Sequence, residues 1–267
     1  MKKLLVFAVL LIAVIASGCG DKFAKEKEAI TKAEQAAMAM KLPDISEPDY
    51  SKKPSKEDWE KYHKNFKEFI ETETKMLAEM KKSDTKVAEM EKTASESEKK
   101  DLKAFKDKMQ QERMAFVRKV SKGRLRGDTF IVGVGSTWQE VEMVYGQPKT
   151  KKSDYDYDYG GLVFSDWYSK GVPPKGYKFV SQSPQAVVVT SDKYVSDAGI
   201  KIGMTKDEFY KTLRSKYVKK NKYMKEDYMK TEKDFVVYSF AMQDTQPNNL
   251  FCEFKDGKLV RYSVAPH

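Results

Sequence analysis

The chain has 267 residues, and its 50 Lys and Arg outnumber its 40 Asp and Glu, for a formal net charge of +10. This length has room for one or two compact domains with a good-sized core, which excludes a small scaffold held together by disulfides. The charges occur in runs of mixed sign, so we interpret them mainly as solvated helix faces, with weak attraction to an anionic membrane as a second reading. No basic stripe interleaves with stacking aromatics, which argues against nucleic-acid binding.

Residues 1–18 predict a lipoprotein signal peptide. Lys2 and Lys3 precede the apolar run "LLVFAVLLIAVIA", which is short for a membrane span and has the proportions of a signal sequence. The run ends in "ASGC", which resembles a bacterial lipobox, although Ala16 stands where Leu is commonest. The resemblance implies that Cys19 is acylated (palmitate among the chains) and anchors the protein in the cell membrane or outer membrane, facing outside the cytoplasm. The alternatives are a plain secretory signal followed by a chance cysteine, or an uncleaved anchor helix.

Residues 19–54 are expected to form a lipid-anchored tether with one short helix, and residues 55–127 a charged helical region. Apolar residues recur at helical spacing in three stretches, which begin near Phe23, Trp59 and Leu102. Ser55 is a candidate N-cap for the second helix. Between the last two stretches, "EKTASESEKKD" predicts a turn or a frayed helix end. We expect a helical hairpin or small bundle, with a protruding coiled-coil stalk as the alternative.

Beyond residue 127 the period of the apolar residues shortens toward two. Strand-like runs occur at "GGLVFSDWY", "YKFVS", "QAVVVTSDKYV", "FVVYSFAM", "LFCEFK" and "KLVRYSV". The segment "KDGK", with Asp256 and Gly257, predicts a hairpin turn between the last two strands. In "LFCEFK", alternation places Leu250, Cys252 and Phe254 on one strand face. The fold class is therefore α+β with antiparallel sheets.

Two segments of this half match each other without gaps, "VGVGSTWQEVEMVYGQP" and "IKIGMTKDEFYKTLRSK". Each has an extended piece, then a glycine that permits a tight approach, then Thr and, three residues later, Glu. Thr and Glu at this spacing form a reciprocal capping box at a helix start. The repeated residues are Gly135, Thr137 and Glu140 in the first copy and Gly203, Thr205 and Glu208 in the second. The repeat predicts two similar helix-and-sheet units, residues 128–198 and 199–267.

These residues resemble the SmpA/OmlA family of small envelope lipoproteins, and the doubled layout is similar to that of β-lactamase inhibitory protein. The resemblance covers roughly residues 130–267. It implies two tandem units, each a helical pair on an antiparallel sheet of three or four strands. The second copy departs from the pattern because it lacks the helix-ending Gly-x-Pro of Gly146 and Pro148, and the helical N-terminal half has no counterpart in a typical member.

The run "KSDYDYDYGG" alternates aspartates with tyrosines. As an EF-hand loop it fails, because Tyr159 and Ser165 stand where the glycine and the glutamate are needed. A strand would place the carboxylates on one face and the rings on the other, and the resemblance makes this the first strand of its unit. Because adjacent carboxylates repel one another, we expect the aspartate face to be exposed. A looser ion site stays open, with Asp154, Asp156 and Asp158 as its ligands.

Few catalytic parts occur in the sequence. The two histidines, His63 and His267, make a histidine triad or a multi-histidine metal site improbable, and Cys252 is expected to be a buried structural thiol. We therefore expect a non-enzymatic protein without a cofactor, which binds an unknown envelope protein. The alternative is an ion- or ligand-binding module on the aspartate face. The candidate partner-binding residues are aromatic: Tyr155, Tyr157, Tyr159, Trp167, Tyr168, Tyr177 and Tyr238. For each of them, burial under the helices of its own unit is the competing reading.

Overall fold

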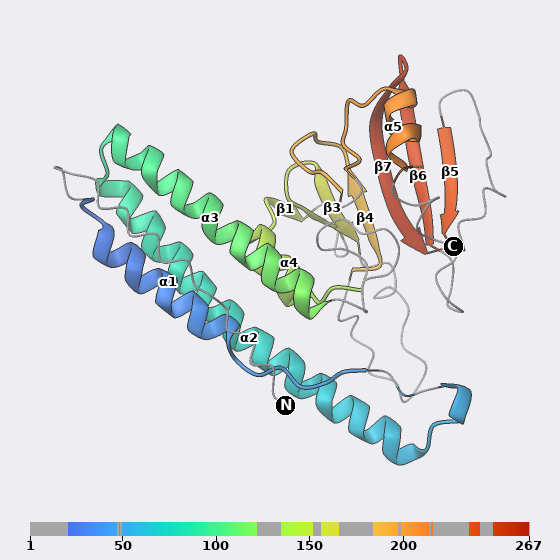
Figure 1. The fold of residues 1–267 in the computed structure, drawn as a ribbon, viewed down its shortest axis with the longest axis horizontal. Helices are drawn as coiled ribbons and strands as arrows, with labels where there is room; N and C mark the ends of the chain where they lie inside the picture. The colour runs from blue at the N-terminus through green and yellow to red at the C-terminus, as the bar shows by residue number, and fades with distance from the viewer. Residues whose placement is uncertain are drawn as a thin grey trace, which may run out of the picture.

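A computed structural model describes residues 21–46, 48, 50–121, 135–151, 156–165, 184–196, 199–213, 215, 235–240 and 248–266. The predicted signal peptide, Cys19 and the run "YKFVS" lie outside these residues. In the described part, helices α1 (Ala24–Met38), α2 (Lys56–Thr93) and α3 (Glu96–Val120) lie side by side as a bundle, and a mixed helix-and-sheet unit follows (Figure 1). The α+β class predicted from the sequence is confirmed, and the sheet is antiparallel throughout.

The bundle helices begin where the sequence offers caps. The Ser55 hydroxyl accepts a hydrogen bond from the Asp58 backbone N–H at 3.1 Å, and an Asp58 carboxylate oxygen accepts from the Ser55 backbone N–H at 2.9 Å. These reciprocal bonds satisfy N–H groups that have no partner inside the helix. A short 3-10 turn (Tyr50–Lys52) precedes this start. Helix α1 packs along α2 and α3 and buries Phe23, Ile30 and Ala37, so it is an integral part of the bundle.

The link between α2 and α3 is much shorter than the sequence reading suggests. The segment "EKTASESEKKD" is helical except for Ala94 and Ser95, because α2 continues to Thr93 and α3 begins at Glu96. Ser95 and Glu98 form a capping box, in which the Ser95 N–H donates to a Glu98 carboxylate oxygen at 2.6 Å. The turn predicted in this segment is therefore present, but it is confined to Ala94 and Ser95 because this cap starts α3 directly after it.

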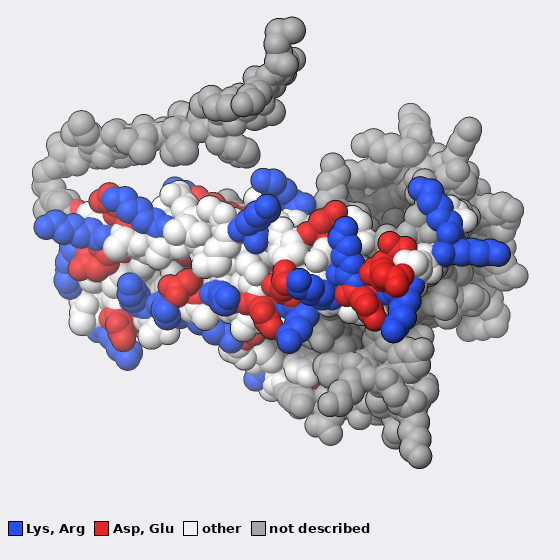
Figure 2. Space-filling model, turned by 90° about the horizontal axis from the view of Figure 1, so that it is seen from below, with Lys and Arg blue, Asp and Glu red and all other residues white. Residues whose placement is uncertain are grey.

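The outer surface of the bundle is charged, with both signs interspersed along its length (Figure 2). Ion pairs four residues apart, such as Lys32 with Glu28 at 2.6 Å, link neighbouring turns. No helix in the described ranges is long and apolar enough to span a membrane.

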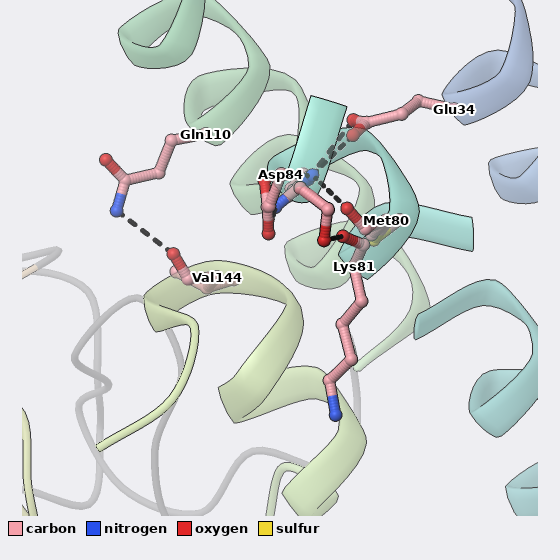
Figure 3. Close-up of polar contacts among 8 residues, drawn as sticks. Glu34, Met80, Lys81, Asp84, Gln110 and Val144 are labelled. Atoms are coloured by element: carbon pink, nitrogen blue, oxygen red, sulfur yellow. Dashed lines mark hydrogen bonds and ion pairs between the residues drawn. The ribbon is translucent and has the colours of Figure 1, made fainter. Parts of the chain in front are cut away.

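Three charged residues of helices α1–α3 are buried and so depart from the solvated-face reading, and two of them meet inside the bundle. Arg113 on α3, with 8% of its side chain exposed, donates through Nε and Nη2 to the carboxylate of Glu34 on α1, which is 2% exposed. Arg113 also donates to the exposed Asp84 on α2, at 3.1 and 2.9 Å, and to the Met80 carbonyl at 3.2 Å. Figure 3 shows Glu34, Asp84 and the Met80 carbonyl around the guanidinium group that binds all three. One guanidinium therefore joins all three helices. The third residue, Glu73, is described below.

Burial alone would lower the pKa of Arg113, but its hydrogen bonds to Glu34 and Asp84 raise that pKa above the usual value. The guanidinium therefore stays charged, and its charge offsets the cost of burying the Glu34 carboxylate.

The sheet has seven strands in the described residues, in the order β1-β2-β3-β4-β7-β6-β5. Their bounds are β1 Thr150–Lys151, β2 Asp156–Asp158, β3 Leu162–Ser165, β4 Ala186–Val189, β5 Phe235–Phe240, β6 Asn248–Lys255 and β7 Lys258–Pro266. Strand β4 pairs with β7, so the strands that follow α4 (Trp138–Tyr145) and those that follow α5 (Lys206–Leu213) join in one continuous sheet. The predicted turn joins β6 to β7, with φ of 51° at Asp256 and 74° at Gly257.

Helices α4 and α5 cover the same face of the sheet. The covered face is lined by buried side chains from neighbouring strands that pair with one another. Examples are Phe164 opposite Val187, and Val264 opposite Leu250. Phe209 of α5 lies edge-to-face on Phe254, with ring centroids 5.5 Å apart. The same hydrophobic core includes Met76, Met80 and Val117 of the bundle and Val141 and Val144 of α4. The bundle and the sheet thus share one core.

We expect Arg113→Ala to lower the free energy of unfolding by about 3–5 kcal/mol, because it leaves the Glu34 carboxylate buried without its cation. The matched control is Lys106→Ala, which breaks the exposed α3–α2 ion pair with Glu91 and should cost at most about 1 kcal/mol. Urea unfolding followed by circular dichroism measures both. Equal losses for the two variants would contradict a special role for the buried cluster.

Candidate functional site

The start of α4 is the point at which the bundle holds the sheet. The Thr137 hydroxyl accepts a hydrogen bond from the Glu140 backbone N–H at 3.1 Å, and a Glu140 carboxylate oxygen accepts from the Thr137 N–H at 2.8 Å. The same hydroxyl donates to the Glu73 carboxylate of α2 at 2.6 Å. Glu73, Thr137 and Glu140 are all buried, with Glu73 fully enclosed. The cap of α4 is therefore also a contact between the bundle and the sheet unit.

Two further polar contacts fix α4 along its length. Lys81 of α2 forms an ion pair with Glu142 at 2.8 Å. At the helix end, the Gln110 side-chain amide of α3 donates to the Val144 carbonyl at 3.0 Å, as Figure 3 shows. That carbonyl lies in the last turn, where helix geometry leaves acceptors without internal partners. Both α2 and α3 thus position α4, and through it the first half of the sheet.

Helix α5 begins with the same capping box but in an exposed setting. The Thr205 hydroxyl accepts from the Glu208 N–H at 3.3 Å, and a Glu208 carboxylate oxygen accepts from the Thr205 N–H at 2.8 Å. This backbone hydrogen bond is the main reason why the pKa of Glu208 is lowered. The loop before α5 is tied to β7, because the Gly203 N–H donates to the Leu259 carbonyl at 2.8 Å.

The repeated glycines before the two helices are required by backbone conformation. Gly135 has φ of 98° and Gly203 has φ of 90°, values that residues with a Cβ rarely adopt. A Cβ at Gly203 would meet nothing within 4 Å. At Gly203 the expectation of a tight approach is therefore wrong, and the positive φ is the reason for glycine.

The aspartate–tyrosine run forms part of a strand and the turn that follows it. Strand β2 pairs with β1 and β3, so it is the second strand of the sheet and not the first. Asp156 accepts a hydrogen bond from the Ser165 hydroxyl at 2.5 Å, and Asp158 accepts from the Gly160 and Gly161 N–H groups at 2.7 and 3.2 Å. Both aspartates are half-buried, so the exposed aspartate face is corrected to a half-buried, hydrogen-bonded one. Asp154 lies outside the described residues.

The tyrosines of this run pack inward. Tyr157 lies against Trp138 of α4, with ring centroids 4.7 Å apart, and Tyr159 is 7% exposed among Tyr145, Phe164 and Tyr194. Burial is the main cause of the raised pKa of Tyr159. Tyr159 is thus a core residue and not part of an exposed docking face. Of the other candidates, Tyr238 pairs with Leu250 in the backbone register, and Tyr155, Trp167, Tyr168 and Tyr177 lie outside the described residues.

A different row of residues emerges as the candidate site, on the sheet face opposite α4 and α5, which we call the second sheet face. Pairing across five strands, β2, β3, β4, β7 and β6, brings five half-buried residues into line. They are Asp158, Val163, Val188, Ser263 and Phe251. At one side of the row Arg261 and Glu253 are exposed and form an ion pair at 4.0 Å, while on the other side Ser165 and Ala186 are buried.

Part of this row follows from the sequence. The prediction that Leu250, Cys252 and Phe254 share one face is confirmed, since all three are buried in the same core. The same alternation puts Phe251 and Glu253 on the other face. The pairing of Val163 with Val188 and of Val188 with Ser263 depends on registers that only the structure supplies.

Two further groups that could take part in chemistry, the Cys252 thiol and the His63 imidazole, lie outside this row. Cys252 is a free, buried thiol, and burial raises its pKa well above the usual value. His63 lies on the exposed face of α2 and stacks on Trp59, with ring centroids 6.0 Å apart. Within the described ranges, no group of three or more His, Cys, Asp or Glu side chains could hold a metal ion.

Comparisons with protein-family models, with curated proteins and with solved structures give no match for this chain.

The two capping boxes provide a matched test of the junction. Thr137→Val removes the cap of α4 and the donor to the buried Glu73 carboxylate, whereas Thr205→Val removes an exposed cap only. We expect Thr137→Val to lower the unfolding free energy by about 1–3 kcal/mol more than Thr205→Val does, because a buried acceptor loses its donor. Urea titration measures the difference. Thr137→Ser keeps the hydroxyl and should retain most of the stability; equal effects at both threonines would contradict the coupling to Glu73.

Proposed function

We propose that this chain is a lipid-anchored bacterial envelope protein that acts by binding another envelope protein, without catalysis. The anchor is the lipobox cysteine Cys19 after a signal peptide of residues 1–18. The binding surface is the second sheet face. The observation that carries the binding proposal is the contrast between the two faces of one sheet. One face is covered by α4 and α5, and the other carries a half-buried row in which three of the five residues are apolar.

The chemistry of this row suits a protein partner. Val163, Val188 and Phe251 offer apolar area in one line, and the Arg261–Glu253 pair at its margin supplies a polar rim. Protein interfaces typically combine an apolar centre with polar residues around it. Phe251, as the largest side chain of the row, is the proposed anchor of the contact.

The finer fold is part of the same proposal. We propose that α4 with β1–β4 and α5 with β5–β7 are two related units of the SmpA/OmlA type. Their helices share the Gly, Thr and Glu start, with positive φ at both glycines. The strand order also supports two units, because each contributes its last strand, β4 or β7, to the central pair.

The anchor is tested by replacing Cys19. We expect the parent chain to incorporate a palmitate analogue and to sediment with membranes, and Cys19→Ala to lose both properties because it has no thiol to acylate. Cys252→Ala is the matched control: its thiol is buried, so lipidation should be unchanged. Membrane retention and full labelling of Cys19→Ala would show that the lipobox reading is wrong.

The binding face is tested by placing a charge in the row. Val188→Lys puts an ammonium group at the centre of the second sheet face and should abolish capture of the partner from detergent-solubilised membranes. The control is Val195→Lys, at a valine that is already 40% exposed outside this row. Circular dichroism verifies folding of both variants. If Val188→Lys captures the partner as well as the parent chain does, or if Val195→Lys loses capture equally, the binding surface is not the second sheet face.

A further inference from the structure

The N-terminal end of α1 lies at the turn that joins α2 to α3. The Lys22 ammonium donates to the carbonyl of Thr93, the last residue of α2, at 2.8 Å. Phe23 is buried in a small core with Val87, Met90 and Leu102. Residues 21–23 and 92–98 therefore form one end of the bundle, which we call the hairpin tip.

The length of chain before Asp21 determines where a lipid on Cys19 must be. Only Gly20 separates Cys19 from Asp21. A fully extended chain spans at most about 3.6 Å per residue, so the two Cα atoms lie within about 7 Å of each other in any conformation. Acyl chains on Cys19 enter the bilayer, and the hairpin tip is then the part of the described protein nearest the lipid surface.

The sheet is attached to the bundle well away from this tip. The nearest polar contact between α2 and α4 is made by Lys81, twelve residues before Thr93, and the contact with the α4 cap is made by Glu73, twenty residues before it. At a rise of 1.5 Å per residue these contacts lie about 18 Å and about 30 Å from the tip along the helix axis. Figure 1 shows the sheet beside the opposite half of the bundle, and the first turns of α2 extending away from the tip.

The sides of the bundle offer little for a bilayer to bind. A helix that lies on a membrane buries an apolar face among the lipids, but here apolar residues of all three helices, such as Ile30, Val87 and Val117, lie in the buried core. In the described part of the chain, the exposed large hydrophobic residues are Met40 and Val195, at 37% and 40%. Figure 2 shows acidic and basic side chains interspersed on one side of the bundle, without a field of a single sign. The tip is thus favoured over the sides as the face toward the lipid.

We propose that the helical bundle is a spacer that stands on its hairpin tip at the lipid surface and holds the second sheet face away from the bilayer. This inference rests on the proposed acylation of Cys19 and adds to it an orientation. The bundle also gives the partner a defined position. The partner would contact the second sheet face at a distance above the lipid headgroups that is set by the lengths of α2 and α3.

The test places a fluorophore on single introduced cysteines of the lipidated full chain. Suitable sites are exposed in the structure: Ser97→Cys at the tip, Lys75→Cys midway and Lys61→Cys near the start of α2. Lys61 lies thirty-two residues before Thr93, about 48 Å along the axis. Cys252 is buried and the Cys19 thiol carries lipid, so neither competes for the label. The protein is reconstituted in phosphatidylethanolamine–phosphatidylglycerol vesicles with a nitroxide on the headgroup as quencher.

We expect the label at residue 97 to lose most of its emission, the label at 75 to lose little and the label at 61 to lose none. Equal quenching at the three sites would mean that the bundle lies flat, and stronger quenching at 61 would mean that it is inverted; either result overturns the proposal. The same labels in a Cys19→Ala background should be unquenched, because that chain does not bind vesicles. If that chain binds as the lipidated one does, the anchor itself is wrong, which is a failure distinct from that of the orientation.

Discussion

The buried ion cluster around Arg113 is the constraint on which the described structure depends. A guanidinium on α3 satisfies the carboxylate of Glu34 on α1 and reaches Asp84 and the Met80 carbonyl on α2. Such a cluster adds little net stability over an apolar core, but a displaced partner leaves a charge uncompensated in the interior. It therefore acts mainly on specificity, because it fixes the relative register of three helices whose outer faces are similar mixtures of Lys and Glu. The register in turn places Glu73, Lys81 and Gln110 of the bundle beside α4.

One short helix, α4, connects the bundle to the sheet and fixes their relative position. Helix α4 has eight residues, too few to be stable alone, so its position is imposed by its neighbours. Glu73, Lys81 and Gln110 hold its start, middle and end, and its apolar side packs on Phe164 and the strands beyond. Helix α5 has the same length but is held mainly through β7, with an exposed cap. The two helices, alike in sequence, are thus supported to different degrees.

The features that the sequence predicts best are local. Capping boxes, the Asp256–Gly257 turn and the alternation in "LFCEFK" depend on residues a few positions apart, and each is present in the structure. The start of α3 is local in the same way, because Ser95 and Glu98 have the spacing of a capping box. The polar residues around them make this start difficult to distinguish from a loop by composition. Arg113 and Glu34 are 79 residues apart, and nothing local distinguishes them from the exposed charges around them. The second sheet face depends likewise on strand registers, whereas the tyrosine pattern is visible in the sequence but Tyr159 is buried in the structure.

The order of strands has a consequence for how the chain folds. Strand β4 finds its second neighbour in β7, more than sixty residues later, while β5 and β6 lie farther out. Pairings between distant segments require closure of a long loop and slow folding. Until β7 is in place, β4 presents an open edge of the kind that recruits strands from other chains. A chain that completes its sheet with a late strand is vulnerable to aggregation in that interval, and the local caps and hairpin turn, which need no distant partner, shorten it.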